Sequence, residues 1–172
     1  AARLLWFREQ GYLPEALVNF LALMGYSQPD GEEIFSFAQM SADFDWARVN
    51  TVGPVFDLEK LGWLNGHYIR ALTVAELADR IMSHLSRTGL LPAQPTASQR
   101  ELVRAATPLV SERMQVLSEA ESMLAFLIVE DGAFEVDADD AAKVLTADAA
   151  AVLAASVAAL AELGEWTTAA IE

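Results

Sequence analysis

The sequence has no cysteine and only two histidines among its 172 residues, which narrows the chemistry it can carry. Without cysteine there can be no disulfide and no thiolate metal site, and this absence suits a cytosolic protein. His67 and His84 fall on separate predicted helices with no carboxylate at metal-ligand spacing, so we expect a structural or surface role for each and no metal site. The sequence also has no phosphate-cradling glycine loop and no nucleophile elbow, so it carries no credible active site of its own.

The sequence also lacks an apolar run long enough to span a membrane. Its longest run, residues 149–161, is rich in alanine and lies between Asp148 and Glu162. A bilayer requires about 20 such residues, so we interpret this run as a buried amphipathic helix and expect no membrane partner. The chain opens at Ala1 with neither an initiator methionine nor a leader, which we interpret as a mature or excised piece of a cytoplasmic protein.

Positive charge is scarce and unevenly placed. The chain has 11 Lys and Arg residues against 25 Asp and Glu, a net charge of −14, whereas proteins that bind polyanions are usually basic. Residues 1–113 hold ten of the basic residues and thirteen of the acidic ones, a net charge of −3, and residues 114–172 have a net charge of −11. Only the first two-thirds of the chain could therefore present a basic face to a nucleic acid.

The sequence does contain a succession of helical patterns, and strand signals are sparse. Pro14 stands where the first turn of a helix tolerates proline, and Asp57 can cap a later helix. Pro108 should end or kink a helix because proline has no N–H donor and clashes with the preceding turn. Together these patterns predict an all-α helical bundle.

Two helix starts carry the spacing of a capping box, in which a hydroxyl residue is followed three positions later by an acid. One pair is Thr73 with Glu76, and the other is Ser118 with Glu121. We therefore expect a helix to begin just after Thr73 and another just after Ser118.

Two segments resemble glutamyl-tRNA synthetases. They read FREQGYLPEALVNFLALMGYS and GPVFDLEKLGWLNGHYIR, and the family has segments of the forms GFLPEALLNYLALLGWS and FDxxKLxWxNxxYI in the same order. The residues that match the second form are Phe56, Asp57, Lys60, Leu61, Trp63, Asn65, Tyr68 and Ile69. Because the likeness continues through LVSERMQVLSE to GEWTTAAIE, it covers the whole chain.

The resemblance implies a helical part of a class I synthetase that binds glutamate-accepting tRNA as a monomer. It implies a stem-contact region at residues 1–70, a first anticodon-binding helical subdomain at 71–135, and the truncated start of a second at 136–172. The parent enzyme would attach L-glutamate to tRNA with ATP and Mg, but the Lys-Met-Ser-Lys-Arg signature and the nucleotide-binding fold are missing here. We therefore expect no cofactor in this chain and no ligase activity from it alone.

Arg113 is the strongest candidate for a residue that reads RNA. By resemblance it matches the family arginine that reads the third anticodon base, and it follows the helix break expected at Pro108. A guanidinium can contact a base edge at two points, which an ammonium cannot. The alternative is a surface charge paired with Glu112 or Glu119, an arrangement that is common and weak.

Four further residues are weaker candidates for tRNA contacts. By resemblance Lys60 and Trp63, three residues apart, face the tRNA or the junction with the catalytic domain. Alternatively, Trp63 packs in the core beside the aliphatic stem of Lys60. Arg48 and Arg70 are candidates for phosphate contacts, which position RNA without reading its sequence.

A different class of function stays open at this point. The acidic last third of the chain favours a non-catalytic helical module for protein–protein interaction. Binding to tRNA that weakens steeply with salt would support the RNA-binding interpretation, and no binding at low salt would support the other. An autonomous enzyme is the least favoured interpretation, because no catalytic constellation is present.

Overall fold

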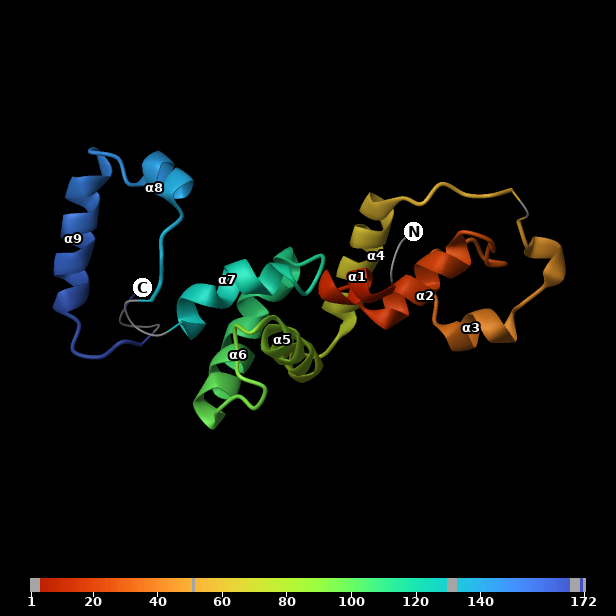
Figure 1. Ribbon diagram of the computed structural model, residues 1–172, viewed down its shortest axis with the longest axis horizontal. Helices are drawn as coiled ribbons and strands as arrows, with labels where there is room; N and C mark the ends of the chain where they lie inside the picture. Colours follow the sequence, from red (N-terminus) through yellow and green to blue (C-terminus); the bar gives the residue numbers. More distant parts are fainter. Residues whose placement is uncertain (1–3, 51, 130–132, 168–170, 172) are drawn as a thin grey trace. The chain divides into compact units, whose positions relative to one another are not determined.

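The structure is a computed structural model that describes residues 4–50, 52–129, 133–167 and 171. Within these residues the secondary structure is helical (Figure 1), and extended backbone pairs at one isolated antiparallel bridge, between Tyr26 and Val49. The predicted all-α class is therefore confirmed. The chain divides into two compact units, residues 1–129 and residues 130–172.

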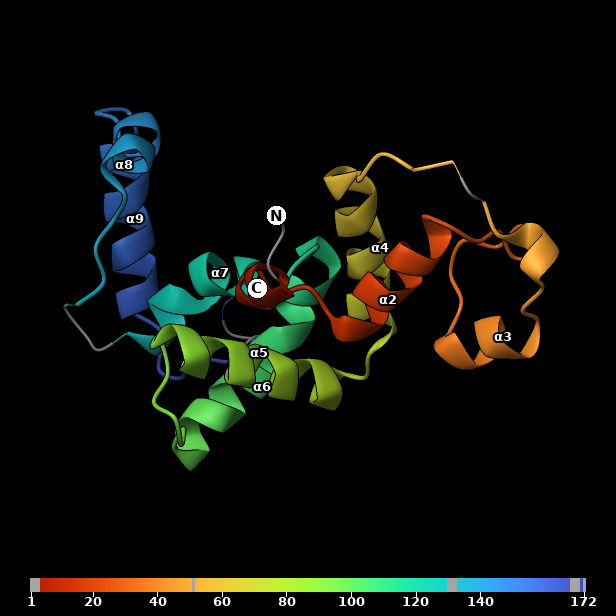
Figure 2. The same ribbon diagram turned by 45° about the vertical axis from the view of Figure 1, so that its right-hand side comes forward.

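The first unit contains two sets of helices joined through α4. In chain order its helices are α1 (Leu4–Glu9), α2 (Pro14–Leu23), α3 (Phe37–Ala42), η1 (Trp46–Arg48), α4 (Leu58–Ala71), α5 (Val74–Thr88), α6 (Ala97–Val110), η2 (Ser111–Arg113) and α7 (Glu119–Ile128), where η marks a 3-10 helix. In both views α2 lies beside α4, and α5 lies beside α6 (Figure 2).

Side-chain caps fix where several of these helices begin. Pro14 occupies the first turn of α2, as predicted, and the Asp57 carboxylate caps α4 by accepting hydrogen bonds from the backbone of its first turn. Thr73 and Glu76 form the predicted capping box of α5, whose other end closes on Gly89 in the left-handed conformation. Pro108 lies inside α6, which continues to Val110 before η2 begins, so the helix ends near the proline as expected.

α7 begins at Glu119, just after Ser118 as predicted, but the capping box predicted for Ser118 and Glu121 does not form. The Ser118 hydroxyl donates instead to the carbonyl oxygen of Gln10 at 2.9 Å, and Glu121 binds the ring of His84. Consequently α7 begins without a side-chain cap. Both side chains bind partners that are distant in the sequence, and local spacing cannot reveal such partners.

Two apolar clusters form the interior of the first unit, and α4 belongs to both. Leu61 and Leu64 lie in one cluster with residues of α1 and α2, whereas Ile69 lies in the other with residues of α5, α6 and α7. All three side chains are fully buried. Burying such a side chain is worth roughly 1.5–3 kcal/mol, so α4 ties the two clusters into one unit.

The second unit contains α8 (Ala138–Val144) and α9 (Ala149–Ala161), and none of the residues of these two helices is buried. A helix at residues 149–161 was predicted correctly, but its predicted burial is wrong, because Val152 and Val157 are each 67% exposed. Two short helices offer each other too little surface to enclose a core. Among the described residues no single helix is long and apolar enough to cross a membrane, and α8 and α9 would pass that test only together, across a bend of 94°.

Candidate nucleic-acid interface

One side of α4 faces outward and carries Trp63, His67 and Arg70. These positions are four and three residues apart, so they line one face of the helix, and all three residues are exposed. Trp63 is 48% exposed, so it does not pack in the core as the alternative interpretation expected. Arg70 lies in the last turn of α4, where the helix dipole favours a cation.

Residues that follow η2 approach α4 closely at two glycines. A Cβ at Gly66 would lie 3.0 Å from Nη1 of Arg70 and 3.4 Å from the carbonyl oxygen of Met114. A Cβ at Gly62 would lie 3.1 Å from the side-chain oxygen of Gln115. Larger residues would therefore press on these groups, and glycine leaves the room that they need.

Arg113 is the last residue of η2, and its side chain is exposed. An arginine has five N–H donors, and Nη2 of Arg113 donates to the carbonyl oxygen of Leu109 at 3.3 Å. Nη1 of Arg70 donates to the carbonyl oxygen of Met114 at 3.5 Å. The structure thus brings the Arg70 side chain against the backbone that carries Arg113. We name Trp63, His67, Arg70 and Arg113 the α4–η2 face.

The alternative role considered for Arg113, a pair with Glu112 or Glu119, is not seen among the described side chains. Glu119 instead accepts hydrogen bonds from the N–H groups of Gln115 and Val116, at 2.6 and 3.2 Å. Through these two bonds Glu119 holds the segment after Arg113 in place. Glu119 also lies near Tyr12: burial first, and then the negative charge of Glu119, raises the pKa of the Tyr12 hydroxyl.

Lys60 and Arg48 have other partners. The Lys60 ammonium forms an ion pair with Glu33, and the Arg48 guanidinium donates to the carbonyl oxygen of Gln28 at 3.4 Å. Arg48 ends η1, which is far along the chain from η2. Neither cation therefore belongs to the α4–η2 face, although Lys60 lies one turn before Trp63 on α4.

The segment after Arg113 is anchored by Asn65, which is not among the residues predicted for the site. Asn65 is fully buried; its side-chain oxygen accepts from the N–H of Leu13 at 2.7 Å, and its amide nitrogen donates to the carbonyl oxygen of Gln115 at 2.5 Å. The N–H of Leu117 donates to the carbonyl oxygen of Gly11 at 3.0 Å. An asparagine set among the buried apolar positions of a predicted helix was the signal that could have identified it.

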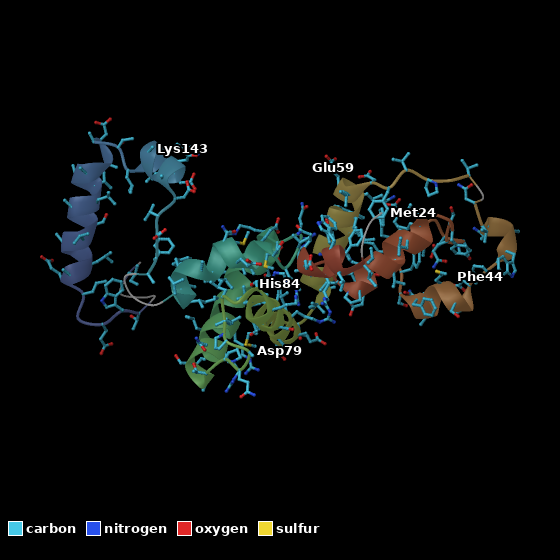
Figure 3. All side chains as sticks on the ribbon, viewed as in Figure 1. Met24, Phe44, Glu59, Asp79, His84 and Lys143 are labelled. Atoms are coloured by element: carbon cyan, nitrogen blue, oxygen red, sulfur yellow. The ribbon has the colours of Figure 1, made fainter. Side chains whose placement is uncertain are left out.

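His84 has the structural role expected for it. Its ring is fully buried, and Nδ1 lies 2.7 Å from Nη2 of Arg87. Because arginine can only donate, Nδ1 must accept, and Nε2–H then donates to the Glu121 carboxylate at 2.9 Å. Arg87 also donates to the carbonyl oxygen of Arg8 at 2.9 Å, so the network joins α5, α7 and α1. Figure 3 shows His84 within the group formed by α5, α6 and α7.

The described residues do not fit ATP or Mg²⁺. No group of three or more His, Cys, Asp or Glu side chains among them could hold a metal ion. The sequence also has no glycine-rich phosphate loop. No chemical step is therefore assigned to either group in this chain.

Two family matches cover most of the chain. Residues 74–172 match the family described as "Anticodon binding domain", and residues 2–63 match "tRNA synthetases class I (E and Q), catalytic domain". The first match covers more than half of the sequence, so the chain belongs to the anticodon-binding domain family.

The relatives of this chain are glutamate–tRNA ligases, as the two sequence motifs predicted. The enzyme of Acidothermus cellulolyticus is 57% identical over 171 residues, which are 99% of this chain and 34% of the relative. That of Thermus thermophilus is 42% identical over 127 residues, 73% of this chain and 26% of the relative. The chain spans about a third of the length of the first of these relatives.

A solved structure has a similar fold. It is described as a glutamate tRNA ligase from Elizabethkingia meningosepticum in complex with its amino acid. The TM-score is 0.69 at 25% sequence identity, over 92% of this chain and 30% of that one.

Proposed function

We propose that this chain is the tRNA-binding and anticodon-recognition part of a glutamate–tRNA ligase, which in translation joins L-glutamate to its tRNA with ATP and Mg²⁺ in the cytoplasm. The α4–η2 face is the observation that carries the proposal, because Arg70 lies against the backbone next to Arg113 and the exposed Trp63 is on the same side of α4 as Arg70. Splayed anticodon bases are bound by stacking on aromatic or guanidinium planes and by hydrogen bonds to their edges. The face offers both kinds of group.

In this proposal the two arginines of the α4–η2 face have different roles. Arg113 reads the third anticodon base, because it is exposed and has no ion pair among the described residues. Arg70 holds an RNA phosphate, because its position in the last turn of α4 fixes its direction while most of its donors stay available. Trp63 stacks on a base. Lys60 and Arg48 hold phosphates further along the tRNA, after exchanging their present partners for the RNA.

We further propose that residues 1–70 contact the tRNA stem and that residues 71–135 form the first anticodon-binding subdomain of a monomer. Residues 136–172 begin the second subdomain. The change from one family match to the other between residues 63 and 74 supports the first boundary. The start of a separate compact unit at residue 130 supports the second.

The test is Arg113→Ala in a full-length glutamate–tRNA ligase that carries this segment. Losing one two-pronged base contact should remove roughly 1–3 kcal/mol of discrimination at the third anticodon base. Arg70→Ala should instead weaken binding of every tRNA about equally and lower the salt slope by about one. Charging is measured with cognate tRNA and with a tRNA changed at that base alone.

The matched control is Arg48→Ala, which removes an exposed arginine outside the α4–η2 face. It should leave the ratio between the two tRNAs at the wild-type value. If Arg113→Ala also leaves that ratio unchanged, Arg113 does not read the base and the proposed role is wrong.

A further inference from the structure

Arg113 is carried by a segment with little regular structure of its own. It ends the short helix η2, and the residues from Met114 to Ser118 are not helical. A group that reads a base edge must be held to within about 0.5 Å of its working position. Contacts from outside the segment must therefore supply that restraint.

We propose that Asn65 is the positioning residue for Arg113, and this inference rests on the base-reading role proposed above. The Asn65 amide is fully buried and binds two backbone groups that are distant in the sequence, the N–H of Leu13 and the carbonyl oxygen of Gln115. A side-chain amide is suited to this because it presents an acceptor and a donor from one rigid plane. Asn65 thereby fixes the segment that carries Arg113 to the start of α2.

Further contacts hold the same segment to the residues between α1 and α2. The N–H of Leu117 donates to the carbonyl oxygen of Gly11, and a Cβ on Gly11 would lie 2.6 Å from the Leu117 nitrogen. The hydroxyl of Ser118 donates to the carbonyl oxygen of Gln10. Because these bonds begin two residues beyond Gln115, Asn65 holds the segment nearer to Arg113 than they do. Arg70, on the same helix, also binds the carbonyl oxygen of Met114, at the longer distance of 3.5 Å.

The chain offers a matched control in Asn19, which is 2% exposed. Its oxygen accepts from the N–H of Phe35 at 3.2 Å, and its amide nitrogen donates to the carbonyl oxygen of Glu33 at 3.0 Å. Like Asn65, Asn19 accepts from one backbone N–H and donates to one backbone carbonyl, and its oxygen also accepts from the Tyr68 hydroxyl at 3.0 Å. The backbone that Asn19 holds lies between α2 and α3. A loss of stability should therefore be shared by changes at both asparagines, whereas a loss of base reading should follow Asn65 alone.

The experiment compares Asn65→Asp with Asn19→Asp in the 172-residue chain. The aspartate at 65 still accepts from Leu13 but cannot donate to Gln115, so it breaks the bond on the side of Arg113. Binding is measured at low salt, where phosphate contacts are strongest. The probes are two anticodon stem-loop RNAs that differ at the third anticodon base alone.

Wild type should prefer the cognate RNA by roughly 5- to 150-fold, the range of one good bidentate contact. Asn65→Asp should bring this ratio down to about the value for Arg113→Ala while leaving affinity for the other RNA nearly unchanged, because the phosphate contacts remain. Asn19→Asp should keep the wild-type ratio. Circular dichroism and thermal melting identify the temperatures at which each variant is folded.

The outcomes separate this inference from the proposed function. A wild-type chain without base preference, or a preference that survives Arg113→Ala, would refute the base-reading role and this inference with it. A preference lost in Arg113→Ala but kept in Asn65→Asp would overturn the role of Asn65 alone.

Asn65→Ala and Asn19→Ala, which bury no carboxylate, replace the first pair if aspartate at 65 prevents folding. The same ratios are expected for them. If both Asn65 variants are unfolded while both Asn19 variants fold, Asn65 is a residue of the general fold and the inference is wrong.

Discussion

Leu85 in α5 and Leu153 in α9 are the same residue type on helices of 15 and 13 residues, yet Leu85 is fully buried and Leu153 is 47% exposed. Their neighbours differ. Leu85 meets side chains from α6 and α7 within a large apolar cluster, whereas α9 has no buried residue at all. The apolar character of a helix therefore does not bury it, because burial needs partner helices that cover the same face.

The two units also differ in charge. Ten of the 11 basic residues lie in residues 1–113, and the second unit has Lys143 as its one basic residue. That lysine already pairs with Asp140 at 3.2 Å. Cations that could meet RNA phosphates are thus concentrated in the first unit.

Truncating a leucine should give the largest difference in unfolding free energy between the two units. Leu85→Ala should lower the free energy of unfolding by roughly 2–5 kcal/mol, because it removes a buried side chain and leaves a cavity. Leu153→Ala should change it by less than about 0.5 kcal/mol, as for other exposed substitutions. Urea unfolding followed by circular dichroism measures both, and equal losses would show that α9 is packed after all.

A second contrast uses one glycine from each unit. Gly11 has a φ of 82°, and a Cβ there would lie 2.6 Å from the backbone nitrogen of Leu117, whereas nothing lies near Gly164. Gly11→Ala should cost roughly 1–2 kcal/mol for the left-handed backbone and roughly 1–3 more for the close contact. Gly164→Ala should have almost no effect. Thermal melting of both variants tests this prediction. A Gly11→Ala variant as stable as wild type would mean that the backbone at Gly11 and Leu117 is not closely packed.

Local sequence signals predicted where helices begin because the bonds that cap a helix form within a few residues of its start. The cap at Asp57 and the box at Thr73 depend on bonds within one turn, and both were confirmed. Ser118 had the same kind of signal, but its hydroxyl bonds to Gln10, 108 residues away. A competing long-range partner of this kind depends on the whole fold, and so does the exposure of α9.

The candidate interface was only partly predictable for the same reason. Arg113 came from the resemblance, and chemistry alone would have favoured a surface ion pair that the structure lacks among the described residues. Lys60 matched the family pattern equally well, yet it is paired with Glu33 from another segment. Asn65 lay within the same motif, but its task depends on Leu13 and Gln115, which no spacing rule places beside it.

The polar network of the first unit should matter less than its core. His84→Ala removes one of the two acceptors of the Arg87 guanidinium and empties a buried site, so we expect a loss of roughly 1–3 kcal/mol in the free energy of unfolding. The matched control is His67→Ala, at an exposed position of α4, with an expected change below about 0.5 kcal/mol. Denaturant unfolding near neutral pH compares them, and similar values would contradict the structural role of His84.

The smallest contrast concerns two ion pairs and pH. The Glu15–Arg80 pair at 2.7 Å links α2 to α5, and the hydrogen bond from Arg80 lowers the pKa of Glu15 below its usual value of 4.5. A carboxyl with a lowered pKa contributes its full stability above the usual value and loses it as the pH falls through the lowered one. Both side chains are more than a third exposed, so the contribution at neutral pH should stay below about 1 kcal/mol. Glu15→Gln should therefore be slightly less stable than wild type at pH 7, and the gap should close below pH 4.5.

The Asp140–Lys143 pair in the second unit is 73% and 72% exposed, so Asp140→Asn should have no measurable effect at either pH. Thermal melting of both variants and wild type from pH 7 to below pH 4.5 tests this prediction. If Glu15→Gln stays less stable than wild type in acid, the pair stabilises the protein through packing and not through charge.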